Sequence, residues 1–191
     1  MTQFVRLSPK DRGLIDSVVK EVSLEKGEVY LQQGDVCNRL GFVTQGILHY
    51  YIDQDGIEQT YNFATEEQMV CDYDSMIRRA PSVKSIRAIE PSVILTISYR
   101  DLQTLYTNLG EGERFGRLHL ERVYGDTIRQ LVSQYTESPE VRYRKFVKQF
   151  PGLTQRIPQY YIASYIGVKP QSLSRIRKRM STSTISEPRA Q

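Results

Sequence analysis

The chain has 191 residues, of which 39% are hydrophobic and 25% are charged, as in an ordinary globular protein. It contains no apolar run of about 18 residues and no apolar signal core near its start, so we expect neither a membrane span nor a membrane partner. Its two cysteines are too few for a disulfide framework and fit a reducing, cytoplasmic location.

The charge is distributed unevenly along the chain. Residues 140–180 contain ten Lys and Arg against a single acidic residue, Glu140, whereas residues 1–139 contain fifteen basic and twenty acidic residues. A mildly acidic front part and a strongly basic end are expected when sensing and nucleic-acid binding reside in separate domains. A solvated basic face is the alternative explanation.

The first predicted element is a helix that begins after Ser8. Pro9 suits the first helical position, and Asp11 completes a capping box with Ser8. We expect this helix to end near Lys20, with its apolar side formed by Leu14, Ile15, Val18 and Val19.

The hydrophobic pattern then changes to a period of two, which indicates short β-strands. Glycine-containing turns separate them, and Asp55-Gly56 is a strong hairpin signal. The expected strands cover residues 22–24, 28–32, 40–44, 47–53, 57–64, 69–71, 83–90 and 93–98. Such a series predicts a jelly-roll β-barrel or sandwich, a fold that can enclose a small ligand.

Two helices are predicted after the strands, over residues 101–108 and 113–135. Along the longer one, every third or fourth residue belongs to a narrow, mostly apolar stripe flanked by charged residues. The stripe consists of Leu120, Val123, Tyr124, Thr127 and Leu131. Packing against the chain's own barrel would produce a similar stripe. We expect a homodimer seam, because a DNA-binding motif follows.

That motif covers residues 159–180, after a further helix capped by Ser138. Ile162 and Ile166 lie one helical turn apart, and Leu173 and Ile176 repeat the spacing beyond a break at Gly167. Gly167 fits a turn with positive φ, while Pro170 suits the start of a second helix that carries five basic residues and no acidic one. This pattern predicts a helix-turn-helix.

The order of β-barrel, long helix and basic helix-turn-helix resembles the Crp/Fnr family of bacterial transcription regulators. KGEVYLQQGD and GFVTQGILHYYIDQDGIEQTYNF are similar to the cyclic-nucleotide-binding-domain pattern, and RIPQYYIASYIGVKPQSLSRIRK closely resembles the family's DNA-binding segment. The resemblance implies an α+β chain with a sensor domain (1–108), a dimerisation helix (109–137) and a helix-turn-helix domain (138–180). We expect residues 181–191 to be a disordered tail, without the β-hairpin wing that usually follows the recognition helix.

The phosphate-binding cassette departs from the family pattern. Members that bind a cyclic nucleotide have a Gly-Glu pair for the ribose, a short helix, and Arg-Ser or Arg-Thr for the phosphate. The matching stretch here, VCDYDSMIRRAPSVKSIRAIE, leaves only Arg78, Arg79 or Lys84 to supply a cation. The degenerate pocket that we expect consists of Tyr61, Cys71, Asp72, Ser82, Val83 and Lys84. We therefore expect a small-molecule effector other than cyclic AMP, or none.

The resemblance also assigns DNA contacts in the second helix of the motif. It places Gln171, Ser172 and Arg175 near base edges and adjacent phosphates, which fits the pairing of Arg with guanine and Gln with adenine. Other basic residues there suit phosphate contacts, which position the protein without specifying sequence. The full expected set is Gln159, Lys169, Gln171, Ser172, Ser174, Arg175, Arg177, Lys178 and Arg179.

Catalytic and metal-binding patterns are absent from the sequence. His49 and His119 lie far apart, and Cys37 and Cys71 form no CxxC pair, so we expect no metal, no cofactor and two core cysteines. No Gly-rich phosphate loop, HExxH or nucleophile elbow occurs, and we expect no enzyme. A cupin-type metalloenzyme, the enzymatic alternative, would need more histidines in the strands.

The sequence thus favours a transcription regulator that binds a palindromic operator as a homodimer. The expected partners are double-stranded DNA and a second copy of the chain, with RNA polymerase and a small effector as further candidates. The alternative is a ligand-binding barrel that acts through a protein partner.

Overall fold

The computed structural model describes residues 6–184 and divides into two compact units. The N-terminal unit extends to Ile128, and the C-terminal unit begins at Arg129. Helix α4 (Gly112–Thr136) crosses this boundary without interruption. The helix expected within 109–137 is thus a single element, but it belongs in part to each unit, and its role in dimerisation stays a prediction.

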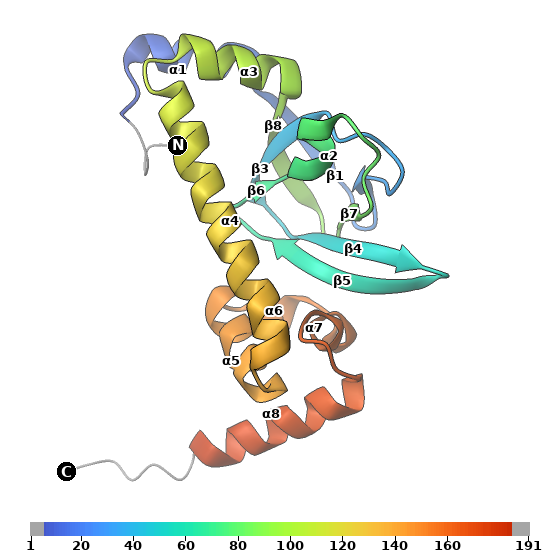
Figure 1. Cartoon of the computed structure of the whole chain (residues 1–191). Coiled ribbons are helices and arrows are strands. Elements are labelled where there is room, and N and C mark those ends of the chain that lie inside the picture. Colours follow the sequence, from blue (N-terminus) through green and yellow to red (C-terminus); the bar gives the residue numbers. More distant parts are fainter. Residues whose placement is uncertain (1–5, 185–191) are drawn as a thin grey trace, which may run out of the picture. The chain divides into compact units, whose positions relative to one another are not determined.

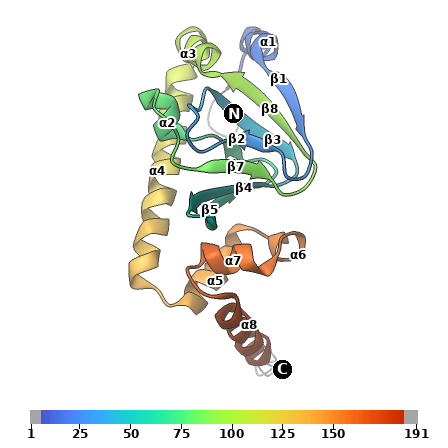
Figure 2. The same ribbon diagram turned by 90° about the vertical axis from the view of Figure 1, so that its right-hand side faces the viewer.

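The N-terminal unit is a sandwich of two antiparallel four-stranded sheets, with strand orders β1-β8-β3-β6 and β2-β7-β4-β5 (Figures 1 and 2). All eight predicted strands and the jelly-roll architecture are confirmed. The strands are β1 (Lys20–Leu24), β2 (Val29–Leu31), β3 (Arg39–Gln45), β4 (Leu48–Gln54), β5 (Ile57–Ala64), β6 (Met69–Val70), β7 (Ser85–Ala88) and β8 (Ser92–Ser98).

Apolar side chains fill the space between the two sheets. Val43 and Ile94 from one sheet and Leu48 and Ile86 from the other are fully buried. Burial of these side chains removes apolar surface from water, and in β8 it alternates along the strand, which fixes the register of that strand.

Two glycine positions explain how the chain turns between strands. Asp55 and Gly56, between β4 and β5, both have positive φ (55° and 81°), as a type I′ hairpin turn requires. Gly46 has φ of 95°, and a Cβ there would lie 2.2 Å from Ser92 Oγ, so a larger residue would not fit.

Three short helices accompany the sandwich. Helix α1 (Pro9–Val18) begins with the predicted capping box between Ser8 and Asp11 and lies beside α3 (Tyr99–Asn108) in Figures 1 and 2. None of its residues is fully buried, so its apolar side is only partly covered. Helix α2 (Tyr73–Arg78), between β6 and β7, lies where the family cassette has its short helix, although its six residues show no clear helical period of their own.

The C-terminal unit continues beyond α4 with helices α5 (Pro139–Gln149), α6 (Leu153–Arg156), α7 (Gln159–Tyr165) and α8 (Pro170–Thr184). Ser138 caps α5 as predicted. The short helix α6 was not predicted. Since α8 ends at Thr184, the expectation of disorder from residue 181 is wrong for residues 181–184, which are helical, and residues 185–191 lie outside the described part.

Candidate functional site

Helices α7 and α8 form the predicted helix-turn-helix. Gly167 has φ of 73° in the turn between them, and the Val168 N–H donates to the Ala163 carbonyl at 2.9 Å. Ala163 is completely buried, so a larger side chain would separate the two helices. The four apolar residues that gave the sequence pattern form the core: Ile162, Ile166, Leu173 and Ile176.

The second helix of the motif presents its polar residues to solvent. Leu173 and Ile176 point inward, and most of the predicted DNA contacts point outward. The exposed residues are Lys169, Gln171, Ser172, Ser174, Arg175, Arg177, Lys178 and Arg179. Gln159, at the start of α7, is half-buried. The surface of α8 thus combines amide, hydroxyl and guanidinium groups, which hydrogen-bond to base edges and phosphates.

A hollow of about 580 Å³ lies beside this surface. Its lining includes Glu140 and Arg179, which form an ion pair, together with Ser172, Arg175 and Lys178. Glu140 is the only acidic residue in the basic segment, and this pair links the first turn of α5 to α8. The sequence assigned Arg179 to phosphate, but in the structure its guanidinium has an acidic partner within the protein.

Another basic residue of this segment has an internal role that the sequence did not indicate. Arg142, on α5, donates to the carbonyl oxygen of Glu137 at 2.5 Å and to that of Ile166 at 2.8 Å.

Aromatic residues also contribute to the core of the C-terminal unit. Tyr161 and Tyr165 are buried, while Tyr160 is exposed.

Helix α4 carries an exposed apolar stripe. Tyr124 is 70% exposed and Leu131 is 52% exposed, while Leu120 and Thr127 are also classed as exposed and Val123 is half-buried. Ile128, Val132 and Tyr135 add to the exposed apolar surface of the same helix. Among residues 6–184, most of this stripe is left exposed to solvent.

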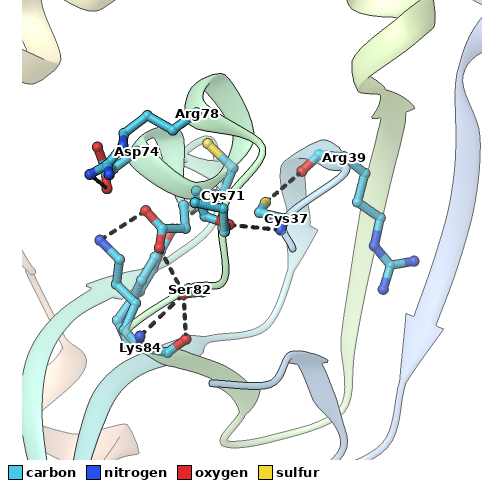
Figure 3. Close-up of polar contacts among 11 residues, drawn as sticks. Cys37, Arg39, Cys71, Asp74, Arg78, Ser82 and Lys84 are labelled. Carbon is cyan, nitrogen blue, oxygen red and sulfur yellow. Dashed lines mark hydrogen bonds and ion pairs between the residues drawn. The ribbon is translucent and has the colours of Figure 1, made fainter. Parts of the chain in front are cut away.

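Three residues of the cassette segment (residues 71–84) and Tyr61 of β5 come together, which makes four of the six predicted pocket residues. Lys84 Nζ lies 3.1 Å from Asp72 Oδ1, and Ser82 Oγ lies 2.7 Å from Asp72 Oδ2 (Figure 3). The Lys84 ammonium also lies 4.8 Å from the ring centroid of Tyr61, a cation–π distance. The Lys84–Asp72 contact is ionic and not a well-aligned hydrogen bond.

The remaining cassette residues point elsewhere. Val83 is 67% exposed and takes no part in this cluster. Cys71 is buried, and its N–H donates to Tyr50 Oη at 3.2 Å. Of the three cations that the sequence left open, only Lys84 joins the cluster: Arg78 pairs with Asp74 on the surface, and Arg79 lies over the ring of Tyr99.

Both cysteines are buried, free thiols, as expected. Burial raises the pKa of the Cys37 thiol, and burial together with the nearby Cys37 and Asp72 raises that of Cys71. Thiols of this kind are poor nucleophiles. Within residues 6–184, no three His, Cys, Asp or Glu side chains are grouped so that they could hold a metal ion. No helix in that range is both long enough and apolar enough to cross a bilayer.

These features define a class of protein. The sequence matches the family described as cyclic nucleotide-binding domain over residues 21–121, more than half of the chain, and the protein belongs to that family. Its sandwich, long helix and helix-turn-helix follow one another in the order of the Crp/Fnr transcription regulators, whose fold it shares.

Solved structures support the same fold over nearly the whole chain. FixK2 from Bradyrhizobium japonicum superposes with a TM-score of 0.76 at 14% identity, covering 91% of this chain and 90% of that one. A CooA mutant from Carboxydothermus hydrogenoformans superposes with a TM-score of 0.69 at 18% identity, covering 94% of this chain and 83% of that one. The c-di-GMP responsive regulator CLP from Xanthomonas campestris superposes with a TM-score of 0.68 at 14% identity, covering 96% of each chain. A search of curated proteins finds no match.

Proposed function

We propose that the protein is a homodimeric transcription regulator that binds a palindromic operator through α8. The observation that carries this proposal is the exposed polar and basic surface of α8 on a helix-turn-helix whose apolar residues are buried. Arg175 and Gln171 lie one helical turn apart on that surface, at the spacing that places two side chains on one face. Both can make bidentate contacts to bases in the major groove.

The exposed stripe on α4 supports the dimer. Apolar residues at this spacing along a long helix pack well against a second helix of the same kind. Two copies joined through α4 would present two recognition helices to successive major grooves, about 34 Å apart on the DNA. A homodimer therefore explains both the unpartnered stripe and the palindromic site that we propose.

The cassette supports an effector other than cyclic AMP, or no effector. A cyclic phosphate needs a cation that the protein leaves available to it. Here the Lys84 ammonium is already paired with the Asp72 carboxylate, and Ser82 hydrogen-bonds within the same cluster. In the described part of the cassette, the ammonium of Lys84 is therefore already neutralised by a carboxylate.

The test is a titration of labelled promoter DNA from the protein's own locus, followed by fluorescence anisotropy at several salt concentrations. We expect the affinity to fall steeply with salt, because binding releases counterions from the phosphates. Arg175→Ala should weaken specific binding by about 1–3 kcal/mol and relax the preference at one base pair of each half-site.

Lys178→Ala is the matched comparison on the same helix. It should weaken specific and non-specific binding alike, since a phosphate contact carries no sequence information. If the wild-type protein binds no DNA at low salt, or if it shows no preference between promoter and unrelated DNA, the proposed function is wrong.

A further inference from the structure

The connection between α4 and α5 consists of Glu137 and Ser138. The Glu137 N–H still donates to the Ser133 carbonyl oxygen at 3.1 Å, which continues the hydrogen-bond pattern of α4. Ser138 is extended (φ −69°, ψ 155°) and precedes Pro139, and a following proline leaves a residue few other backbone conformations. The backbone between the two helices therefore has little freedom to rotate.

The carboxylate of Glu137 joins the two helices. Its Oε2 accepts a hydrogen bond of 2.8 Å from Ser133 Oγ on α4, and its Oε1 forms an ion pair with Lys145 on α5. These hydrogen bonds, with that from Lys145 the stronger influence, lower the pKa of Glu137, so the carboxylate is charged at neutral pH. One side chain thus bridges the last turn of α4 and the middle of α5.

The turn of the helix-turn-helix lies against the same end of α4. Arg142 of α5 donates to carbonyl oxygens on both sides of this contact, as described above. Gln134 of α4 donates to the Tyr165 carbonyl oxygen at 3.4 Å, and a Cβ added at Gly167 would lie 3.3 Å from Gln134 Oε1. All of these residues belong to the C-terminal unit. Side chains of α4 and α5 therefore connect the end of α4 to the turn that precedes α8.

We propose that Glu137 is a positioning residue for DNA binding, whose carboxylate fixes the orientation of α8 relative to α4. The inference rests on the proposed function, in which α4 joins two subunits and α8 reads DNA. If the orientation is fixed in each subunit, the separation of the two recognition helices in the dimer is fixed as well. The protein then accepts a single spacing between the half-sites of its operator.

The experiment compares two DNAs: the operator footprinted in the promoter fragment, and the same operator with one base pair inserted at its centre. The insertion moves one half-site by about 3.4 Å and turns it by about 35°. We expect the wild type to bind the longer operator at least about 30-fold more weakly, because the specific contacts of one half-site are lost. Glu137→Ala should reduce this ratio to less than about tenfold. A variant that is merely less stable would bind both DNAs more weakly by the same factor.

A reversed ion pair provides the rescue. Glu137→Lys alone should relax the spacing preference, and adding Lys145→Glu should restore it. Glu121→Ala is the matched control, because Glu121 pairs with Arg117 within α4 and this exposed pair does not involve α5. It should keep the wild-type preference. The inference is overturned if the wild type binds both operators equally well, if Glu137→Ala discriminates as strongly as the wild type, or if Glu121→Ala relaxes the preference as much.

A distance measurement without DNA tests the same contact. Spin labels on Thr136→Cys and Ser174→Cys report the placement of α8 relative to α4, since both positions are exposed and the two native cysteines are buried. In labelled chains diluted with unlabelled protein, double electron–electron resonance should give a narrow distance distribution. Glu137→Ala should broaden it, and Lys145→Met replaces that variant if it does not fold.

Distributions of equal width with and without the Glu137–Lys145 pair would refute the inference. Failure of the wild type to bind any DNA would instead refute the proposed function. The distance between the labels would then still decide whether Glu137 fixes α8 relative to α4.

Discussion

Arg142 Nε donates a 2.8 Å hydrogen bond to the carbonyl oxygen of Ile166, the C-cap residue that follows α7. The same guanidinium donates to the carbonyl oxygen of Glu137, just beyond the end of α4. One cation thus satisfies the last carbonyls of two helices, which otherwise have no intrahelical partner. It also fixes the turn that positions α8.

Replacing Arg142 tests this role. Arg142→Ala removes two charge-assisted hydrogen bonds from a half-buried site, and we expect it to lower the free energy of unfolding by about 2–3 kcal/mol. Urea unfolding followed by circular dichroism measures the loss. Arg144→Ala, an exposed position on the same helix, should change stability by less than about 0.5 kcal/mol. Equal losses of unfolding free energy in the two variants would show that the hydrogen bonds of Arg142 to the helix ends do not stabilise the fold.

A charge in the exposed stripe of α4 should separate the subunits. Tyr124→Glu places a carboxylate where the proposed dimer buries an aromatic ring, so we expect monomers in analytical ultracentrifugation and a large loss of DNA affinity. Arg122→Glu changes a residue about 200° away around the same helix and should leave the dimer intact. A dimer that persists in Tyr124→Glu would exclude the stripe as the interface.

The buried histidine predicts how stability depends on pH. Burial, with a smaller effect from the charge of Arg87, lowers the pKa of His49 from 6.5 to about 3. In the unfolded chain His49 therefore binds a proton near pH 6.5, whereas in the folded protein it stays neutral until the pH falls to about 3. The contribution of His49 to the free energy of unfolding is complete above the pKa of the unfolded state. It is lost as the pH falls toward the pKa of the folded state.

The expected loss from this group is about 2 kcal/mol between pH 7.5 and pH 5. Burial also lowers the pKa of His119, so this residue too reduces the free energy of unfolding as the pH falls. A variant of His49 is therefore needed to separate the two contributions. His49→Gln should show a shallower decline of unfolding free energy over this range than the wild type. An identical decline in both proteins would mean that His49 can be protonated in the folded state.

The ion pair between Glu140 and Arg179 predicts an unusual salt dependence of DNA binding. While Arg179 is held by Glu140, it contributes little to phosphate neutralisation. Arg179→Ala alone should then leave the slope of log affinity against log salt unchanged. In Glu140→Gln the arginine is released, and the slope should steepen by about 0.9 for each subunit. A reduced slope in Arg179→Ala would show instead that Arg179 contacts phosphate in the wild type.

Local patterns predicted the elements of this protein well. Strand alternation and glycine turns gave the two sheets, and the apolar pairs around Gly167 gave the helix-turn-helix, because both are recorded in neighbouring residues. Ser8 and Ser138 marked helix starts for the same reason.

Those patterns could not predict contacts between residues that lie far apart in the sequence. The family resemblance placed Asp72 and Lys84 in one pocket, but neither residue indicates in the sequence that the two form an ion pair with each other. Arg142 was indistinguishable from the other basic residues of its segment until its two carbonyl partners were placed. Charge counts therefore identified the basic end of the chain but not which of its cations make contacts within the fold.

The geometry around Asp72 has an evolutionary consequence. An Asp codon becomes an Asn or Gly codon by one nucleotide change, and either replacement would remove the carboxylate while leaving Lys84 and Ser82 as they are. A single nucleotide change in this codon therefore leaves the mostly buried Lys84 ammonium without its carboxylate partner, while the residues of the sandwich, the long helix and the helix-turn-helix stay unchanged.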